Sequence, residues 1–251
     1  MTRQTSQAGN LAVALQALGA DVLIIPSIAT IAPDDWGPLD QCIARLESYD
    51  FIVLTSANAL KFLAERLVER RVDGVKALSK CRLCVIGSAT ANAASDLGLT
   101  PFLIPEAADA ESLLESIRQR LGGDAAIAEK TFLIPRSSIA REVLTQGLSE
   151  LGATVDAVDA YKTVVPTADP ALLERLSEKA IDAITFTSPS TVNNFFLILG
   201  RDQALEALRG ALVACIGPVT AKAAEEIGLQ NVFCPSSYDT ESLVAEILNR
   251  L

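Results

Sequence analysis

The 251-residue sequence contains no histidine, and this narrows the chemistry open to the chain. Histidine is the usual general base at neutral pH, a common metal ligand and the partner of catalytic serine or cysteine. Proton transfer is therefore left to tyrosine, serine, threonine, lysine and carboxylates. Tyr161 is the main candidate, because a phenol is protonated at pH 7 and can donate a proton directly or through water. The alternative role for Tyr161 is packing within a β ribbon.

Four loops contain small hydroxyl residues and glycine, and they form two repeated pairs. Thr55-Ser56-Ala57-Asn58 returns as Thr187-Ser188-Pro189-Ser190, and Ile86-Gly87-Ser88-Ala89-Thr90 returns as Ile216-Gly217-Pro218-Val219-Thr220. Each loop follows an apolar run and precedes a helical pattern, so its backbone N–H groups begin a helix and can hold an anion. Alternatively, the hydroxyl residues only cap these helices, which applies to Ser56, Thr90, Ser188 and Thr220.

Two arginines follow related stretches and are candidates to bind a carboxylate. Thr2-Arg3 resembles Pro135-Arg136, and each guanidinium could form a forked pair with a carboxylate or lie free on the surface. Five residues from Thr131 to Pro135 precede Arg136 as a strand, whereas only Met1 and Thr2 precede Arg3. The N-terminal copy of this strand is expected to be truncated.

The repeated blocks predict two similar domains. Strands that alternate with helices of ~10 to 15 residues indicate parallel βαβ units in a doubly wound, flavodoxin-like sheet. We expect one domain to comprise residues 1–26 and 167–251, and the other, a circularly permuted repeat, to comprise residues 37–156. Each should contain five strands. The connectors 27–36 and 157–166 should pair as a two-stranded β hinge, with the repeated loops facing a cleft between the domains.

Composition argues against several classes of protein. A formal charge of -10 disfavours nucleic-acid binding, which requires a basic surface. No apolar run approaches the ~20 residues of a membrane span and no signal peptide is evident, so we expect a cytoplasmic protein with no membrane association. The five cysteines are scattered, and Cys81-Arg82-Leu83-Cys84 lacks a second ligand pair, so we expect no metal site.

Taken together, these blocks resemble those of uroporphyrinogen-III synthases. The blocks that carry the resemblance span the chain in family order: Thr2-Arg3, Leu18-Gly19-Ala20, Thr55-Ser56-Ala57-Asn58-Ala59, Ile86-Gly87-Ser88-Ala89-Thr90-Ala91, Pro135-Arg136, Ala160-Tyr161-Lys162-Thr163, Thr187-Ser188-Pro189-Ser190 and Ile216-Gly217-Pro218-Val219-Thr220-Ala221. Individually the blocks are common, but their order is specific to the family.

The resemblance implies a cofactor-free enzyme that closes hydroxymethylbilane, inverts its last pyrrole ring and releases water to give uroporphyrinogen III. It implies Tyr161 and Thr220 as catalytic residues. The substrate-binding residues it implies lie in the loops and arginines above: Arg3, Ser56, Ala57, Asn58, Gly87, Ser88, Thr90, Arg136, Ser188, Pro189, Ser190, Gly217, Pro218 and Val219. We also expect a monomer that could receive its substrate from hydroxymethylbilane synthase. Two alternatives remain: a two-domain small-molecule binding protein, and a synthase-like domain without activity.

Overall fold

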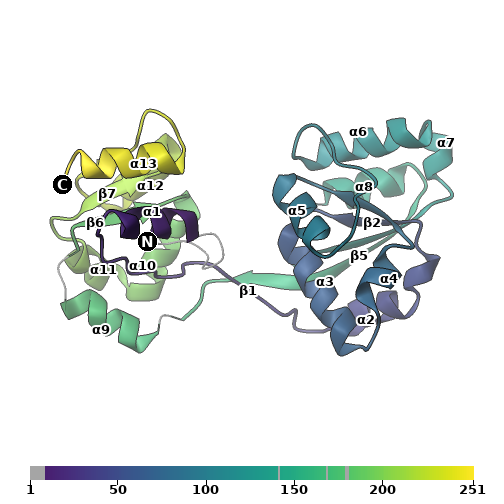
Figure 1. Cartoon of the computed structure of the whole chain (residues 1–251), viewed down its shortest axis with the longest axis horizontal. Coiled ribbons are helices and arrows are strands. Elements are labelled where there is room, and N and C mark those ends of the chain that lie inside the picture. Colours follow the sequence, from purple (N-terminus) through teal and green to yellow (C-terminus); the bar gives the residue numbers. More distant parts are fainter. Residues whose placement is uncertain (1–8, 141, 168, 179–180) are drawn as a thin grey trace. The chain divides into compact units, whose positions relative to one another are not determined.

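The chain folds into two compact units, which are described separately. The computed structural model describes residues 9–140, 142–167, 169–178 and 181–251. Unit 1 comprises Met1–Ala29 and Val164–Leu251, and unit 2 comprises Thr30–Thr163 (Figure 1). Both contain parallel strands and helices, so the predicted α/β class with parallel sheets is confirmed.

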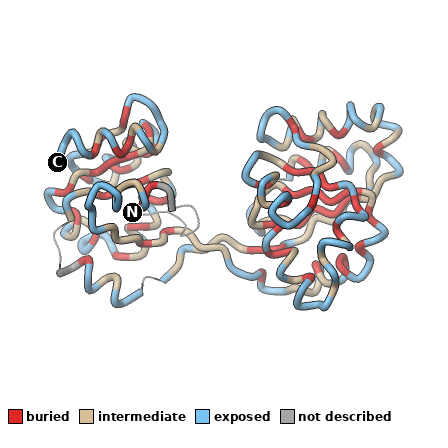
Figure 2. The backbone as a smooth tube through the Cα atoms, viewed as in Figure 1, coloured by how far each residue is buried: buried red, intermediate tan, exposed pale blue. Residues whose placement is uncertain are grey.

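The sheet of unit 2 has five strands in the order β1-β5-β4-β2-β3. Their bounds are β1 Ala29–Ile31, β2 Phe51–Leu54, β3 Arg82–Val85, β4 Thr131–Ser137 and β5 Thr154–Val164. β2 pairs in parallel with β3 and with β4, and β4 pairs in parallel with β5. All four residues of β2 are buried, which is expected of a parallel strand covered on both faces (Figure 2).

Helices cover both faces of this sheet and form two apolar cores. The helices are α2 Gly37–Ala44, α3 Ala57–Glu69, α4 Gly74–Leu78, α5 Ser88–Asp96, α6 Ala110–Leu121, α7 Asp124–Ile127 and α8 Val143–Glu150, with a 3₁₀ turn at Leu46–Ser48. Ile52 and Leu133 belong to one core, whereas Phe51 and Phe132 belong to the other. The alternation follows from the period of two along a strand.

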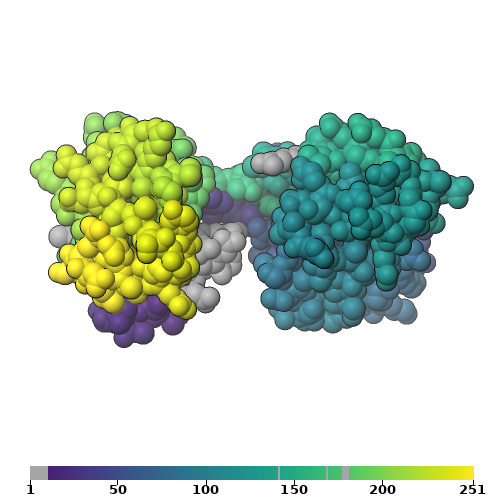
Figure 3. Space-filling model, turned by 90° about the horizontal axis from the view of Figure 1, so that it is seen from above, coloured from purple at the N-terminus to yellow at the C-terminus, as the bar shows by residue number. Residues whose placement is uncertain are grey.

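Unit 1 has a three-stranded sheet in the order β6-β7-β8 among its described residues. The strands are β6 Ala183–Phe186, β7 Leu212–Cys215 and β8 Val232–Phe233, and the helices are α1 Gly9–Ala17, α9 Pro170–Glu178, α10 Pro189–Leu199, α11 Arg201–Ala207, α12 Pro218–Ile227 and α13 Thr240–Leu248. Helix α1 packs against α13, and Figure 3 shows α13 in yellow beside the purple α1.

Five strands were predicted in each domain; the sheet of unit 2 has five, and the described part of unit 1 has three. In unit 2, Leu103 also forms a single parallel bridge with Cys84, outside the five named strands.

The two predicted connectors contain the neighbouring strands β1 and β5. β5 runs without interruption from Thr154 to Val164, so the second connector is the distal half of a strand that begins inside unit 2. Lys162 forms an ion pair with Asp34, with 2.5 Å between Nζ and Oδ1. Whether these segments act as a hinge stays a prediction.

Candidate active site

Two of the four repeated loops have a serine that caps the following helix. The Ser56 Oγ accepts a hydrogen bond from the Ala59 N–H at 3.1 Å at the start of α3. The Ser188 Oγ accepts one from the Thr191 N–H at 3.3 Å at the start of α10, where Thr191 completes a capping box. The capping role predicted for both serines is confirmed. At each of these two helix starts, one N–H group already donates to the capping serine and is not available to an anion.

The capping role proposed for Thr90 and Thr220 is wrong. The N-cap positions of α5 and α12 are Gly87 and Gly217, so each threonine stands three residues later, in the first helical turn. Both threonines are 3% exposed. Within the described residues, no side chain caps α5 or α12. The first N–H groups of a helix have no partner inside it, so these two helix starts are open to an anion.

The two glycine loops differ in backbone conformation and in what covers them. Gly87 has φ +78 and ψ 157, a region occupied almost only by glycine, whereas Gly217 has φ -166 and is extended. A Cβ on Gly87 would lie 3.8 Å from the Cβ of Ala108. A Cβ on Gly217 would lie 3.5 Å from the Cγ of Tyr238, whose side chain is largely exposed. The loop of unit 1 thus carries an aromatic ring where unit 2 has a methyl group.

Arg136 lies at the end of β4 beside a pocket of about 280 Å³ in unit 2. Its Nη1 lies 2.8 Å from the Glu142 Oε1, and this guanidinium holds the pKa of the Glu142 carboxyl below its usual range. The approach is not aligned for a hydrogen bond, and the buried Nε has no hydrogen-bond partner among the described residues. The Ser137 Oγ is likewise buried without one in that part of the chain. Buried donors without partners point to an oxygen-bearing ligand.

The same pocket is also lined by the end of β2 and by the start of α6. Its lining includes Thr55, Ile86 and Ala108. The start of α6 is not an open anion site, because the Asp109 Oδ1 accepts the Ser112 N–H at 2.7 Å. That backbone hydrogen bond lowers the pKa of Asp109. The guanidinium of Arg136 is therefore the group in this pocket that favours a carboxylate.

Tyr161 lies in the core of unit 2, an environment that fits the packing role given above as its alternative. The side chain is 8% exposed, and its ring stacks on Phe62 with 5.7 Å between centroids. The Tyr161 hydroxyl lies 3.1 Å from the Ser56 Oγ. Because the Ser56 Oγ also accepts the Ala59 N–H, its proton is free to point at the Tyr161 oxygen, which leaves the phenolic proton available.

Comparison with known proteins places the chain in a family. The family model described as uroporphyrinogen-III synthase HemD matches residues 9–245. The chain belongs to the uroporphyrinogen-III synthase family. The uroporphyrinogen-III synthase of Synechococcus elongatus is 32% identical over 232 residues, covering 90% of this chain and 84% of the relative. The Chlorobaculum parvum uroporphyrinogen-III synthase is 26% identical over 253 residues, covering 100% of this chain and 98% of the relative.

Solved structures from this family share the fold. A uroporphyrinogen-III synthetase from Helicobacter pylori superposes with a TM-score of 0.61 at 18% identity, covering 92% of this chain and 94% of that one. A mutant uroporphyrinogen III synthase from Thermus thermophilus gives 0.57 at 21% identity, covering 100% and 98%. The predicted family and fold class are thereby confirmed.

The family's candidate residues fall into three groups in the structure. The first surrounds the start of α3 and the Tyr161 hydroxyl, with half-buried Ala57 and Asn58. The second is the pair of glycine loops, where Ser88, Pro218 and Val219 are exposed. In the third, at the start of α10, Pro189 is half-buried and Ser190 is exposed, with its Oγ 2.9 Å from the Ser188 Oγ. Arg3 lies outside the described residues.

Sequence reasoning missed three groups that the structure brings to the site. Thr55 lies next to Ser56 and Ser137 lies next to Arg136, and both neighbours were predicted site residues. Their position beside a predicted site residue could have identified them. Glu142 pairs with Arg136 from six residues away, a spacing that no regular element predicts.

No helix in the described ranges is long and apolar enough to cross a membrane.

Proposed function

We propose that the chain catalyses the reaction for which its family is named. It converts hydroxymethylbilane to uroporphyrinogen III by closing the linear tetrapyrrole, inverting ring D and releasing water. The reaction needs carboxylates to be held, a hydroxide to depart with a proton, and water to be kept from the reactive carbon. The residues of this chain supply groups for the first two tasks.

The observation that carries the proposal is the pair of open helix starts at the glycine loops. Ser88 and Pro218 occupy the same place in the two units, each directly after a glycine at the N-cap of a helix that no described side chain caps. Pro218 has no N–H, so in unit 1 the first N–H group of the helix belongs to Val219. Each start presents backbone N–H groups and the positive end of a helix dipole. This arrangement lets a protein with a formal charge of -10 bind a carboxylate-bearing substrate. Arg136 adds a guanidinium beside the unit 2 loop.

Tyr161 is the proposed proton donor. As the hydroxyl group of the substrate departs, the phenol gives it a proton, and water leaves. The pyrrole carbon then attacks the resulting methylene carbon, and the ring later returns a proton to the tyrosine oxygen. Ser56, at 3.1 Å, holds that oxygen in place and stabilises it while it is deprotonated.

Thr220 is proposed to act near the reacting end of the substrate, as the family resemblance implies. Its side chain is buried in unit 1, and its backbone N–H donates to the Gly217 oxygen at 3.1 Å. These contacts favour a positioning role, in which Thr220 fixes the Gly217 loop, over direct contact between its hydroxyl and the substrate. The remaining loop residues other than Pro189 and Pro218, which have no N–H, are proposed to contact substrate chiefly through backbone N–H groups.

A coupled assay tests the function. Purified protein is added to hydroxymethylbilane generated by hydroxymethylbilane synthase, and isomers I and III of the product are separated. We expect isomer III in excess of the spontaneous isomer I. Formation of isomer I alone by folded protein would reject the proposal, and would leave a binding protein or an inactive synthase-like domain.

We further propose a cytoplasmic location, a monomeric state and transfer of substrate from hydroxymethylbilane synthase. Localisation, size and interaction measurements, in that order, test these three expectations.

A further inference from the structure

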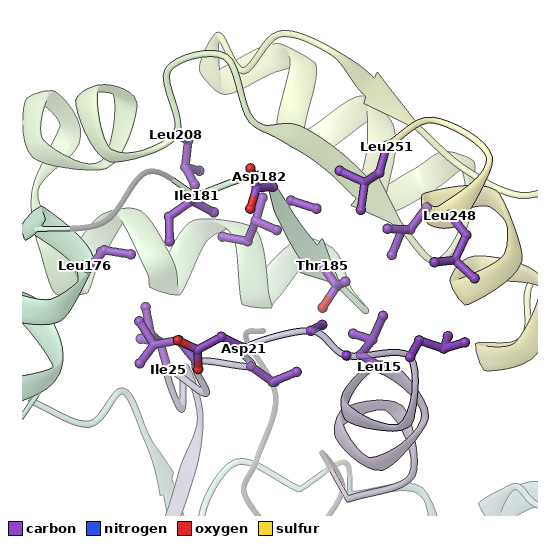
Figure 4. Close-up of a pocket in the computed structure, with 18 of the residues that line it drawn as sticks. Leu15, Asp21, Ile25, Leu176, Ile181, Asp182, Thr185, Leu208, Leu248 and Leu251 are labelled. Carbon is purple, nitrogen blue, oxygen red and sulfur yellow. The ribbon is translucent and has the colours of Figure 1, made fainter.

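Each unit contains a pocket, and the two linings differ. In unit 1 a pocket of about 470 Å³ lies between β6 and the segment after Gly19, and its lining includes the aliphatic side chains of Ile181 and Leu208 (Figure 4). In unit 2 the pocket of about 280 Å³ beside β4 joins aliphatic side chains to the guanidinium of Arg136. These aliphatic residues include Ile86, Ile134, Val143 and Leu144. A short aliphatic chain that ends in a carboxylate has the chemistry to fill such a pocket.

Arg136 has donors that no described residue uses. Its side chain is 18% exposed, and its Nε and Nη1 are both buried without a hydrogen-bond partner in the described part of the chain. A guanidinium has five N–H donors, and a carboxylate accepts two of them at once in a forked pair. Buried donors that have lost water and gained no acceptor lower the free energy of unfolding. A bound carboxylate would remove that cost.

Glu142 pairs with Arg136, but the pairing is incomplete. The 2.8 Å approach of its Oε1 to the Arg136 Nη1 lacks the alignment of a hydrogen bond, so the contact is an ion pair. Glu142 stands at the N-cap of α8, yet its side chain does not cap that helix. The side chain is 48% exposed, and ion pairs with an exposed partner contribute little to stability. Rotation of the Glu142 side chain into water would therefore release Arg136 at little cost.

Two other carboxylates, Asp109 and Glu111, line the pocket from the start of α6. The Asp109 Oδ1 accepts the Ser112 N–H at 2.7 Å, and Glu111 is exposed in the first turn. Both charges lie at the positive end of the α6 dipole, which partly offsets them. Glu142 is in contact with the guanidinium, so its charge opposes an incoming anion at Arg136 more directly.

We propose that Glu142 is an internal carboxylate that pairs with Arg136 while the pocket is empty and gives it up when a carboxylate arm of the substrate enters. Arg136 is then neutralised in both states, because binding exchanges one ion pair for another. Glu142 thereby limits the affinity for the arm and replaces the arm when product leaves. The identity of the molecule that carries the arm rests on the proposed function, whereas the exchange itself can be measured with a simple carboxylate.

The probe is propionate, a short aliphatic carboxylate, at constant ionic strength, and propionamide is its uncharged control. The readout is the proton–nitrogen NMR signal of the Arg136 Nε–H, identified by its loss in Arg136→Lys. We expect propionate, and not propionamide, to shift this signal in the unmodified chain. Glu142→Gln removes the competing charge and should lower the dissociation constant for propionate about threefold to fivefold.

Glu47→Gln is the matched control, because Glu47 is also an exposed glutamate of unit 2 that pairs with a cation. Its Oε1 lies 2.5 Å from the Lys80 Nζ. Lys80 precedes β3 and Arg136 lies near the end of the parallel strand β4, so the two ion pairs lie at opposite ends of the sheet. Glu47→Gln removes the same charge and should leave the dissociation constant for propionate unchanged.

Two results would overturn the proposal: equal propionate affinity in the Glu142 and Glu47 variants, and no shift of the Arg136 signal by propionate in any of the proteins. If Glu142→Gln does not fold, Glu142→Asp, which draws the carboxylate back by one methylene, is titrated under the same two criteria.

The isomer III assay separates this proposal from the proposed function. The KM of Glu142→Gln should fall by a similar factor, and an unchanged KM in an active variant would reject the substrate arm as the group that displaces Glu142. The expected difference in propionate binding without isomer III from any of the proteins would reject the proposed function and still support the exchange at Arg136.

Discussion

The two units repeat one plan but differ at the positions that matter for chemistry. Ser56 and Ser188 cap equivalent helices, yet only Ser56 has a tyrosine hydroxyl beside it. Counting from the shared glycines, the position of Tyr161 in unit 1 is Ile28. Conversely, Tyr238 of unit 1 lies over its glycine loop where unit 2 has Ala108. The repeat thus preserves the helix starts that we propose to bind carboxylates, and single differences between the units place the proposed proton donor in unit 2.

The largest expected effect tests that assignment. Tyr161→Phe keeps the ring stacked on Phe62 and removes the hydroxyl, so isomer III formation should fall about 100-fold, the lower end for loss of a general acid, with little change in melting temperature. The low end is expected because a hydroxyl on an electron-rich pyrrole leaves readily. The measurement is the isomer III rate with the isomer I background subtracted.

The matched control is Tyr49→Phe, in the same unit. The Tyr49 hydroxyl donates to the Asp156 Oδ2 at 2.6 Å, far in sequence from the glycine loops. Its loss should lower stability by roughly 1.5 to 3 kcal/mol and leave the rate unchanged. Equal rates for Tyr161→Phe and the unmodified chain, within about threefold, would return Tyr161 to a packing role and leave positioning as the source of catalysis.

The glycine loops give the next largest difference between the units. Gly87→Ala places a side chain in a backbone region that disfavours it and should cost about 1 to 3 kcal/mol of stability. Gly217→Ala should cost little, because that backbone is extended and the new methyl makes an ordinary contact with Tyr238. If both loops bind carboxylates through their backbone, KM should rise in both variants. A KM change in one variant alone would show that the two loops are not equivalent in binding.

The serine caps should separate stability from rate. Ser56→Ala and Ser188→Ala each remove a cap, and each should cost about 0.5 to 2 kcal/mol in chemical denaturation. Only Ser56→Ala also removes the partner of Tyr161, and loss of a hydrogen bond worth ~1 kcal/mol would slow the reaction about fivefold. Equal rates for the two variants would argue that the contact between Ser56 and Tyr161 serves packing alone.

Local sequence predicted the order of strands and helices, because apolar runs that end in Thr-Ser or Ile-Gly carry both the strand and the following helix start. It failed where the outcome depends on a distant neighbour. Thr90 and Thr220 read as caps, but glycine takes that position in both loops. The sequence alone did not show which surface the ring of Tyr161 contacts, and Phe62, far away in sequence, supplies that surface.

The smallest expected effect concerns two aspartates that should behave alike. Asp109 and Asp239 cap α6 and α13, and each Oδ1 accepts a serine N–H at 2.7 Å. These backbone hydrogen bonds lower the pKa of both carboxyls. Their contribution to stability is thus complete above the unfolded pKa of about 3.9 and is lost as the pH falls through the lower folded pKa.

Asn variants of these two aspartates test whether the units respond equally. Asn also caps helices well but does not titrate in this range, so Asp109→Asn and Asp239→Asn should change stability little at pH 7. Each should remove an equal share of the destabilisation seen between about pH 5 and pH 2. The measurement is the melting temperature against pH for both variants and the unmodified chain. The N–H groups at the starts of α6 and α13 already donate to Asp109 and Asp239, so we do not expect substrate to bind there. Neither variant should therefore alter KM. A change in KM would indicate that substrate binds at α6 or α13.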